Sequence, residues 1–158
     1  MTPTQRKALA LSLATAIAVP AEGLRRTFYY DPPGIPTVCF GHTGPDVDKT
    51  KVYSLDECKA LLTKDMTYAL NAVDRCAPNL PPEALAAFAD AAYNLGPAIA
   101  CDTTKSTAAR LLRAGDVRGA CLQLPRWNRA KVAGVAVELP GLTKRRAAEQ
   151  ALCLKGLE

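Results

Sequence analysis

A nearly uninterrupted apolar run opens the chain. Residues 8–21, ALALSLATAIAVPA, follow the charged pair Arg6 and Lys7. A charged start followed by such a run is typical of a secretory signal, and residues 16–18, Ala-Ile-Ala, resemble a cleavage site. The run is rich in alanine and short for a stable membrane span. Three interpretations therefore stay open for residues 1–21: a soluble first helix, a cleaved signal, or a weak uncleaved membrane anchor.

The pattern changes to short β-prone pieces over residues 28–53. The segments TFYY, IPTVCF and KVY are rich in β-branched and aromatic residues, and Pro, Gly and Asp residues separate them. Such runs between turn-forming residues are typical of a small hairpin or meander. We therefore expect one short β-rich region in a chain that is otherwise mostly helical.

Helical patterns dominate after residue 53. Ser54 and Glu57 form a capping box, which predicts a helix from there to about Cys76. Prolines, glycines and capping residues divide the remainder of the chain. Further helices are predicted over residues 82–95, over residues 105–114, from the cap Asp116 to the stop at Pro125, and from Thr143 to about Lys155. A mainly helical chain with one small β region belongs to the α+β class.

Composition indicates one domain of ordinary size. The chain has 158 residues, of which 49% are hydrophobic, and this is enough to bury a core without a metal. The net charge of +5 fits either a solubilising surface or an anionic partner such as nucleic acid, an acidic cell-wall polymer or a membrane. The sequence has no nucleic-acid recognition motif and no alternation of basic and aromatic residues, so we do not expect nucleic acid as a partner.

Six cysteines need an explanation. The sequence has no Cys-x-x-Cys pair, and His42 is its one histidine, so a metal site is not expected. Disulfide bonds are the better interpretation and would place the protein in an oxidising compartment, whereas buried free thiols are the alternative. Fifteen pairings of six cysteines exist. The order of the predicted elements favours Cys39 with Cys58, Cys76 with Cys101, and Cys121 with Cys153.

Two carboxylates, Glu22 and Asp31, lie nine residues apart at the end of the apolar run. On one α-helix they would be about 13.5 Å apart along the axis and about half a turn out of phase, so one helix cannot bring them together. Residues 32–34, Pro-Pro-Gly, are expected to turn the chain just past Asp31. Hydrolysis of a glycosidic bond needs one protonated carboxyl group and one ionised carboxylate.

The spacing of these groups continues to Thr37. Eight residues separate Glu22 from Asp31, and five separate Asp31 from Thr37. Further segments are TVCFGHTG at 37–44, YNLG at 93–96, STAARLLRAGDVRGACLQLPRW at 106–127 and GLTKRRAAEQALC at 141–153. In this order they resemble the phage-type lysozymes, the endolysins of tailed bacteriophages, over about residues 22–153. The resemblance implies a lysozyme-like α+β catalytic domain over residues 22–158, with a β-hairpin beside the active-site cleft, after the apolar segment 1–21.

For the catalytic groups, the resemblance implies Glu22 as the general acid, Asp31 as the base, and Thr37 as the hydroxyl that helps to hold the attacking water. Because Pro20 favours the start of a new helical turn, Glu22 is expected near a helix N-terminus. The dipole there would favour the ionised carboxylate, and desolvation in the cleft would have to overcome this effect.

Supporting residues are also implied. Arg146 ends a Thr-x-x-Arg element and is expected to lie near Glu22 and orient it. Tyr29 and His42 match positions around the cleft, although plain packing and a hydrogen bond to a hairpin carbonyl are the respective alternatives. Cys121 and Cys153 match paired family positions in part. Trp127 is expected to anchor the core, with a sugar-stacking role as the alternative.

The implied activity is that of a muramidase, which hydrolyses the β-1,4 bond between N-acetylmuramic acid and N-acetylglucosamine in peptidoglycan and so lyses a bacterial host. Inversion is expected because Asp31 would serve a water molecule. A lytic transglycosylase and a non-catalytic cationic module that binds the wall or disrupts membranes are the alternatives. We expect peptidoglycan as partner, no cofactor, and a monomer. Resembling endolysins have signal-anchor-release segments. By this resemblance, residues 1–21 are expected to direct the protein to the host periplasm, first in an inactive form tethered to the inner membrane.

Overall fold

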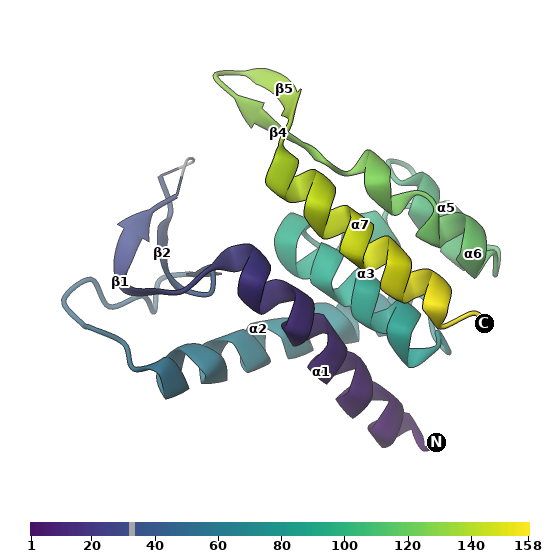
Figure 1. The fold of residues 1–158 in the computed structure, drawn as a ribbon, viewed down its shortest axis with the longest axis horizontal. Coiled ribbons are helices and arrows are strands. Elements are labelled where there is room, and N and C mark those ends of the chain that lie inside the picture. Colours follow the sequence, from purple (N-terminus) through teal and green to yellow (C-terminus); the bar gives the residue numbers. More distant parts are fainter. Residues whose placement is uncertain (32–33) are drawn as a thin grey trace.

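The computed structural model describes residues 1–31 and 34–158, and it has the α+β, mainly helical architecture that the sequence predicts (Figure 1). A small sheet lies at one end, helices α3, α5, α6 and α7 gather at the other, and α1 and α2 run between them. The elements are α1 (Pro3–Glu22), β1 (Arg25–Tyr30), β2 (Pro36–Cys39), β3 (His42–Thr43), α2 (Leu55–Cys76), α3 (Pro82–Leu95), α4 (Ala98–Cys101), α5 (Thr107–Arg113), α6 (Val117–Cys121), the 3₁₀ turn η1 (Leu124–Arg126), β4 (Arg129–Val132), β5 (Val135–Glu138) and α7 (Pro140–Lys155).

Helix α1 is formed by the apolar run and packs on the rest of the molecule. A capping box between Thr2 and Gln5 begins it. Its buried residues, Ala10, Ala14 and Ala18, recur every fourth position and are fully inaccessible to solvent. Small side chains at this spacing form one narrow face, which lets the helix approach α2 and α3 closely. In this structure the segment is therefore a helix packed on the domain.

The end of α1 differs from the prediction. Pro20 lies inside the helix instead of beginning a new turn, and the helix continues to Glu22. Proline within a helix removes one backbone hydrogen bond but does not always end the helix. Here the Gly23 N–H still donates to the Val19 carbonyl, and Arg145 binds Glu22 at the end of the last turn. Glu22 therefore lies at the helix C-terminus, the opposite end from the one expected.

No helix in the described part of the chain is both long enough and apolar enough to cross a membrane.

The predicted β region forms a three-stranded antiparallel sheet in the order β1-β2-β3. Its register shifts between Arg25 and Tyr29 of β1, which marks an irregularity of the bulge type. The segment KVY, predicted as a strand, has no strand assignment, but Tyr53 donates its backbone N–H to the carbonyl of Arg26 at 2.8 Å. This segment therefore runs beside β1 as a loop.

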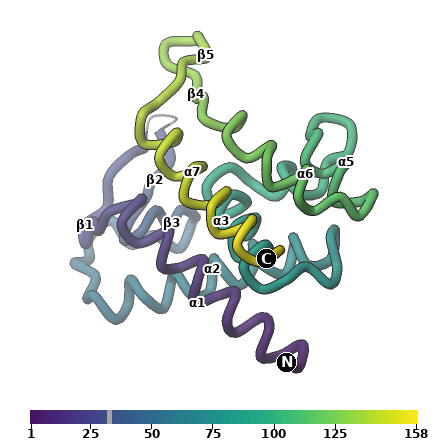
Figure 2. Tube along the Cα trace, turned by 45° about the vertical axis from the view of Figure 1, so that its right-hand side comes forward, coloured from purple at the N-terminus to yellow at the C-terminus, as the bar shows by residue number. Residues whose placement is uncertain are grey.

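Helix α3 forms the centre of the helical part. Every residue from Ala84 to Ala92 is buried, including the charged residue Asp90. Helices α1, α2 and α7 all contact α3, and Figure 2 shows α7 running beside it. A helix that is apolar on nearly every side is typical of a position inside the core.

A second β-hairpin, β4 and β5, is an element that the sequence interpretation missed. Ala133 and Gly134 form its turn with φ values of 52° and 80°. Two successive positive φ values are what a two-residue hairpin turn requires, since they match the right-handed twist of the strands. The hairpin projects beyond the helices (Figure 1), and α7 begins after it at Pro140, three residues before the predicted start at Thr143.

Three disulfide bonds link the elements, and the predicted pairing is confirmed. One joins β2 to α2, one joins the end of α2 to α4, and one joins α6 to α7. The bonded pairs are Cys39–Cys58, Cys76–Cys101 and Cys121–Cys153. Each closes a loop of the unfolded chain and is expected to contribute about 2–4 kcal/mol to the free energy of unfolding.

Candidate functional site

Glu22 is held at the C-terminal end of α1 by contacts on both of its oxygens. Its Oε1 accepts a hydrogen bond of 2.6 Å from Nη1 of Arg145, and its side chain is 21% exposed. Its Oε2 lies against Gly41, where a Cβ atom would come within 3.0 Å of it. Gly41 has a φ of 84°, so the tight approach and the backbone conformation both require glycine.

Arg145 links Glu22 to the helical core. Its Nε and Nη2 donate to the two oxygens of Asp90 at 2.9 and 2.8 Å, while Nη1 serves Glu22. Burial by itself lowers the pKa of the Arg145 guanidinium, but its hydrogen bonds and attraction to Asp90, and then to Glu22, raise this pKa above its usual value. The arginine therefore remains charged and holds two carboxyl groups from two other helices.

The predicted contact of Arg146 with Glu22 is wrong. Arg146 donates from Nε and Nη2 to Glu149, both at 2.6 Å, and from Nη1 to the carbonyl of Trp127 at 3.3 Å. Neighbouring residues of an α-helix point about 100° apart, so choosing between two successive arginines needs the helix orientation. The feature of the sequence that could have indicated a buried arginine is Asp90, an acid within the otherwise apolar stretch 84–92 of α3.

Glu149 and Tyr93 complete the polar surroundings of these arginines. Burial and the nearby Asp90 carboxylate raise the pKa of Glu149, and Arg146 acts against them. Burial is also the main cause of the raised pKa of Tyr93, to which the charge of Glu22 adds. The Tyr93 hydroxyl is therefore neutral, and it donates to the carbonyl of Phe40.

Asp31 and Thr37 lie at the tip of the first hairpin. The Oδ1 of Asp31 accepts the backbone N–H of Ile35 at 2.7 Å, and the Asp31 N–H donates to the Ile35 carbonyl at 3.0 Å. Thr37 is buried, and its hydroxyl donates to the same carbonyl at 3.0 Å. The turn predicted at residues 32–34 lies partly outside the described residues, namely at 32–33. Both candidate side chains thus bond to the backbone of Ile35, Asp31 from just after β1 and Thr37 from β2.

A cavity of about 380 Å³ lies beside Gly41. Thr43 and Gly41 of the sheet region, Asp65 and Tyr68 of α2, and Tyr93 of α3 line it. Since Gly41 also contacts Glu22, the cavity lies next to the candidate acid. Its volume falls within the range of small-ligand sites.

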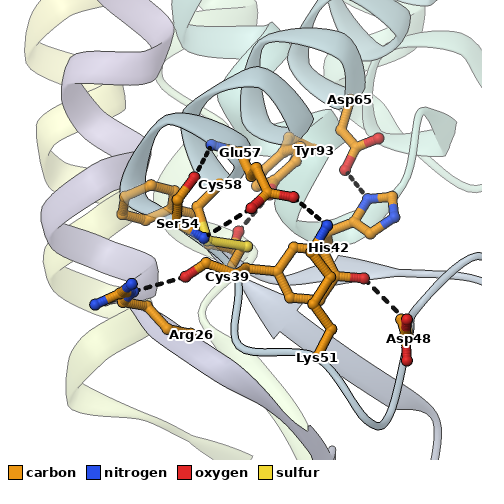
Figure 3. The surroundings of a disulfide bond; sticks show 12 residues. Arg26, Cys39, His42, Asp48, Lys51, Ser54, Glu57, Cys58, Asp65 and Tyr93 are labelled. Atoms are coloured by element: carbon orange, nitrogen blue, oxygen red, sulfur yellow. Dashed lines mark hydrogen bonds and ion pairs between the residues drawn. A yellow bond between two sulfur atoms is a disulfide. The ribbon is translucent and has the colours of Figure 1, made fainter.

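His42 lies between two carboxylates, not beside a hairpin carbonyl as one expectation had it. Its Nδ1 lies 2.6 Å from Asp65, and its Nε2 lies 3.0 Å from Asp46. Figure 3 shows His42 and Asp65 close to the Cys39–Cys58 disulfide and Tyr93. Because two nitrogens facing carboxylates can both donate only in the imidazolium form, the arrangement favours the charged ring.

Tyr29 and Trp127 make packing contacts. The guanidinium of Arg25 stacks over the Tyr29 ring, 4.5 Å from its centre. Trp127 is partly buried and packs against the core, while it also borders a cavity of about 300 Å³ with Lys105 and Arg126. These contacts give both aromatic rings a structural function.

Comparison with known proteins identifies what the chain is similar to. Residues 20–149 match the family model described as phage lysozyme. The chain is 39% identical to the SAR-endolysin of Bacteriophage PS119 over 85% of this chain and 77% of that protein, and 36% identical to the SAR-endolysin of Enterobacteria phage P21 over 99% of both. Among solved structures, the active form of P1 phage endolysin Lyz has a TM-score of 0.79, with 24% identity over 92% of this chain and 85% of that one.

The contacts of His42 predict how stability depends on pH. Burial lowers the pKa of His42, but the hydrogen bonds and charges of Asp65 and Asp46 outweigh burial, so its pKa in the folded protein lies above 6.5. The stability that the charged His42 adds to the folded protein is therefore complete below pH 6.5. It is lost as the pH rises through the pKa of His42 in the folded protein. The bond to His42 lowers the pKa of Asp46 below 3.8, so its part is lost only in strong acid.

We expect His42→Gln to reduce the free energy of unfolding by about 1.5–3 kcal/mol near pH 6, with a smaller loss near pH 9. Urea unfolding of both proteins over this pH range measures the difference. Lys59→Gln, which removes one positive charge from an exposed position of α2, is the matched control. A difference that stays constant from pH 6 to pH 9 would contradict the charged pairing.

Proposed function

This chain belongs to the phage lysozyme family, whose members hydrolyse peptidoglycan, and we propose that it is a muramidase that cuts the β-1,4 bond between N-acetylmuramic acid and N-acetylglucosamine to lyse a bacterial host. The observation that carries the proposal is the placement of Glu22. This carboxyl group is anchored by Arg145 and lies against Gly41 beside a cavity of about 380 Å³.

In the proposed reaction, Glu22 protonates the departing glycosidic oxygen. Its position at the C-terminus of α1, against Gly41 of the cavity lining, supports this role. Arg145 fixes the direction of the carboxyl group through one hydrogen bond to Oε1 and leaves Oε2 on the Gly41 side.

Asp31 acts as the base on the opposite face of the sugar in this proposal, and Thr37 helps to hold the water molecule. The buried Thr37 hydroxyl donates its proton to the Ile35 carbonyl, so its oxygen is oriented as an acceptor for that water. We expect inversion at the anomeric carbon, with a separation of about 6.5–9.5 Å between the two carboxyl groups in the complex with substrate.

We further propose that residues 1–21 direct export without cleavage, tether the enzyme weakly to the inner membrane in an inactive form, and then leave the bilayer to pack as α1. The relatives named SAR-endolysin support this proposal. Apolar residues occur on both faces of the helix, since Leu9 and Val19 are 37% and 41% exposed while the alanine face is buried. Because α1 carries Glu22, the release of the helix would also assemble the site. The released enzyme would be a periplasmic monomer.

Substitutions test the catalytic roles proposed for Glu22, Asp31 and Thr37. Glu22→Gln is expected to reduce the rate of wall lysis by at least about 10²–10⁴-fold, because an amide cannot donate the proton. Asp31→Asn should be similarly severe, and Thr37→Ala should cost less, about 10²-fold. Clearing of purified peptidoglycan measures the rates, with Glu138→Gln on the exposed hairpin as the control for loss of a carboxylate. Wild-type turnover by folded Glu22→Gln protein would refute the assignment.

The products distinguish a hydrolase from a lytic transglycosylase. A transglycosylase lets the muramic 6-hydroxyl attack and gives 1,6-anhydro products, whereas Asp31 and Thr37 should direct water to the sugar. Mass spectrometry of the digest is expected to show muropeptides with free reducing ends, and NMR of the first products to show the inverted α-anomer. A digest of mainly 1,6-anhydro products would remove Asp31 from the mechanism, and no cleavage would favour a non-catalytic wall-binding module.

The proposed anchor can be separated from the folding of the domain. Leu9→Lys puts a charge where the folded helix is partly exposed, so thermal stability should change little, but the same charge opposes insertion into a bilayer by about 2.5–3.5 kcal/mol near the centre of a span. Fractionation of cells that express the full chain should show the wild type partly in the membrane and Leu9→Lys much less so. A wild-type chain that never reaches the membrane, or that always loses its N-terminus, would contradict the anchor.

A further inference from the structure

A buried cluster of four charged side chains lies behind Glu22. Asp90 comes from α3, and Arg145, Arg146 and Glu149 come from α7. Arg145 is 5% exposed, and the other three are fully inaccessible. Charges removed from water in this way are costly unless they are paired, so the number of positive and negative groups in the cluster matters.

The contacts divide the four charges into two pairs. Asp90 receives two hydrogen bonds from Arg145, and Glu149 receives two from Arg146. The pairs adjoin, because Nε of Arg145 lies 4.0 Å from Oε1 of Glu149. Asp90 is therefore the direct partner of Arg145, and Glu22, bonded to the remaining Nη1 of Arg145, is a third carboxyl group on the edge of the cluster.

This pairing bears on the protonation of Glu22. Asp90 is the carboxylate bonded directly to Arg145, and it offsets the positive charge of the guanidinium that contacts Glu22. An arginine without Asp90 would favour the ionised carboxylate, because its charge would be uncompensated. Asp90 thus weakens the attraction by which Arg145 would otherwise favour the ionised form of Glu22.

We propose that Asp90 is a positioning residue that keeps Glu22 protonated for catalysis, by neutralising Arg145 through a bidentate ion pair while leaving one nitrogen of the guanidinium to orient the acid. This inference rests on the proposed role of Glu22 as general acid. It assigns to the buried middle of α3 a function in setting the pH range of the enzyme.

Other charged and titratable groups around Glu22 fit this assignment. From α3, the Tyr93 hydroxyl approaches the same Gly41 position and stays neutral, because burial raises its pKa. From α2, Asp65 is paired with His42, which lies in β3 and also contacts Asp46. From α1 itself, the helix C-terminus adds a partial negative charge. Within the described residues, Arg145 is thus the cation that contacts Glu22, and Asp90 is the group that holds it most closely.

The test is the pH dependence of peptidoglycan cleavage by Asp90→Asn. Activity falls on the alkaline side as Glu22 loses its proton, and without the Asp90 charge this limb of the profile should move to lower pH by about 1 unit or more. Asp90→Glu, which restores the carboxylate, should return the limb toward the wild-type position. An unchanged alkaline limb in folded, active Asp90→Asn protein would overturn the proposal.

Asp74→Asn is the matched control, since it removes a carboxylate that pairs with Arg6 on the opposite part of α1. It is expected to lower stability without moving the alkaline limb. If Asp90→Asn does not fold, the double variant Asp90→Asn/Arg145→Gln leaves no unpaired charge at this pair. Because Asp90 and Arg145 offset one another, its alkaline limb should stay near the wild-type position, and a limb displaced by about 1 unit or more would refute the proposed neutralisation.

A direct titration of Glu22 separates this inference from the proposed function. Carbon-detected NMR of protein with labelled glutamate follows the Glu22 carboxyl group, assigned by its absence in Glu22→Gln, whether or not the protein cleaves peptidoglycan. A lower Glu22 pKa in Asp90→Asn than in the wild type would support the charge balance even for an inactive enzyme. Equal values would overturn it, while an inactive wild-type protein would count against the muramidase proposal alone.

Discussion

The arginine that joins Glu22 to Asp90 is the interaction on which the site depends. Arg145 of α7 binds a carboxyl group at the end of α1 and another in the middle of α3, so three helices meet at one guanidinium. It is 5% exposed, and a charge in that position is stable only with its partners in place. The candidate acid is therefore correctly oriented only when the helical core is assembled.

Packing around this contact uses small side chains and covalent links. Alanines form the buried face of α1 and much of α3, which lets the helices approach closely but gives each contact little apolar area. Polar contacts at both ends of α1, the ion pair of Arg6 with Asp74 and the hydrogen bond from Arg145 to Glu22, add specific attachment points. Disulfide bonds then hold the sheet, α2 and the late helices together. A helix held by shallow packing and terminal polar contacts is well suited to the proposed release from a membrane.

The site combines a rigid side and a loop side. Glu22 is fixed by α7 and by the backbone of Gly41, where no larger residue fits. Asp31 and Thr37 are instead ordered by hydrogen bonds to Ile35 in the hairpin. This division matches the needs of the proposed chemistry, because a proton donor must be aimed at one atom, whereas a base has to leave room for water.

The sequence by itself determined the α+β class and the helices that begin with capping boxes or end at proline, because these depend on local patterns. The order of the predicted elements favoured the three disulfide pairs, and a family resemblance indicated the candidates Glu22, Asp31 and Thr37. Tertiary structure decided that α1 continues through Pro20 to Glu22, where Arg145 of α7 binds the carboxyl group. It also decided that Arg145 and not Arg146 contacts Glu22, because the orientation of α7 about its axis follows from packing against α3. The hairpin β4–β5 escaped prediction because its short strands are mostly exposed and lack a clear alternation of polar and apolar residues. The partners of His42 come from segments distant in the sequence or from a loop, so only the fold could bring its two carboxylates together.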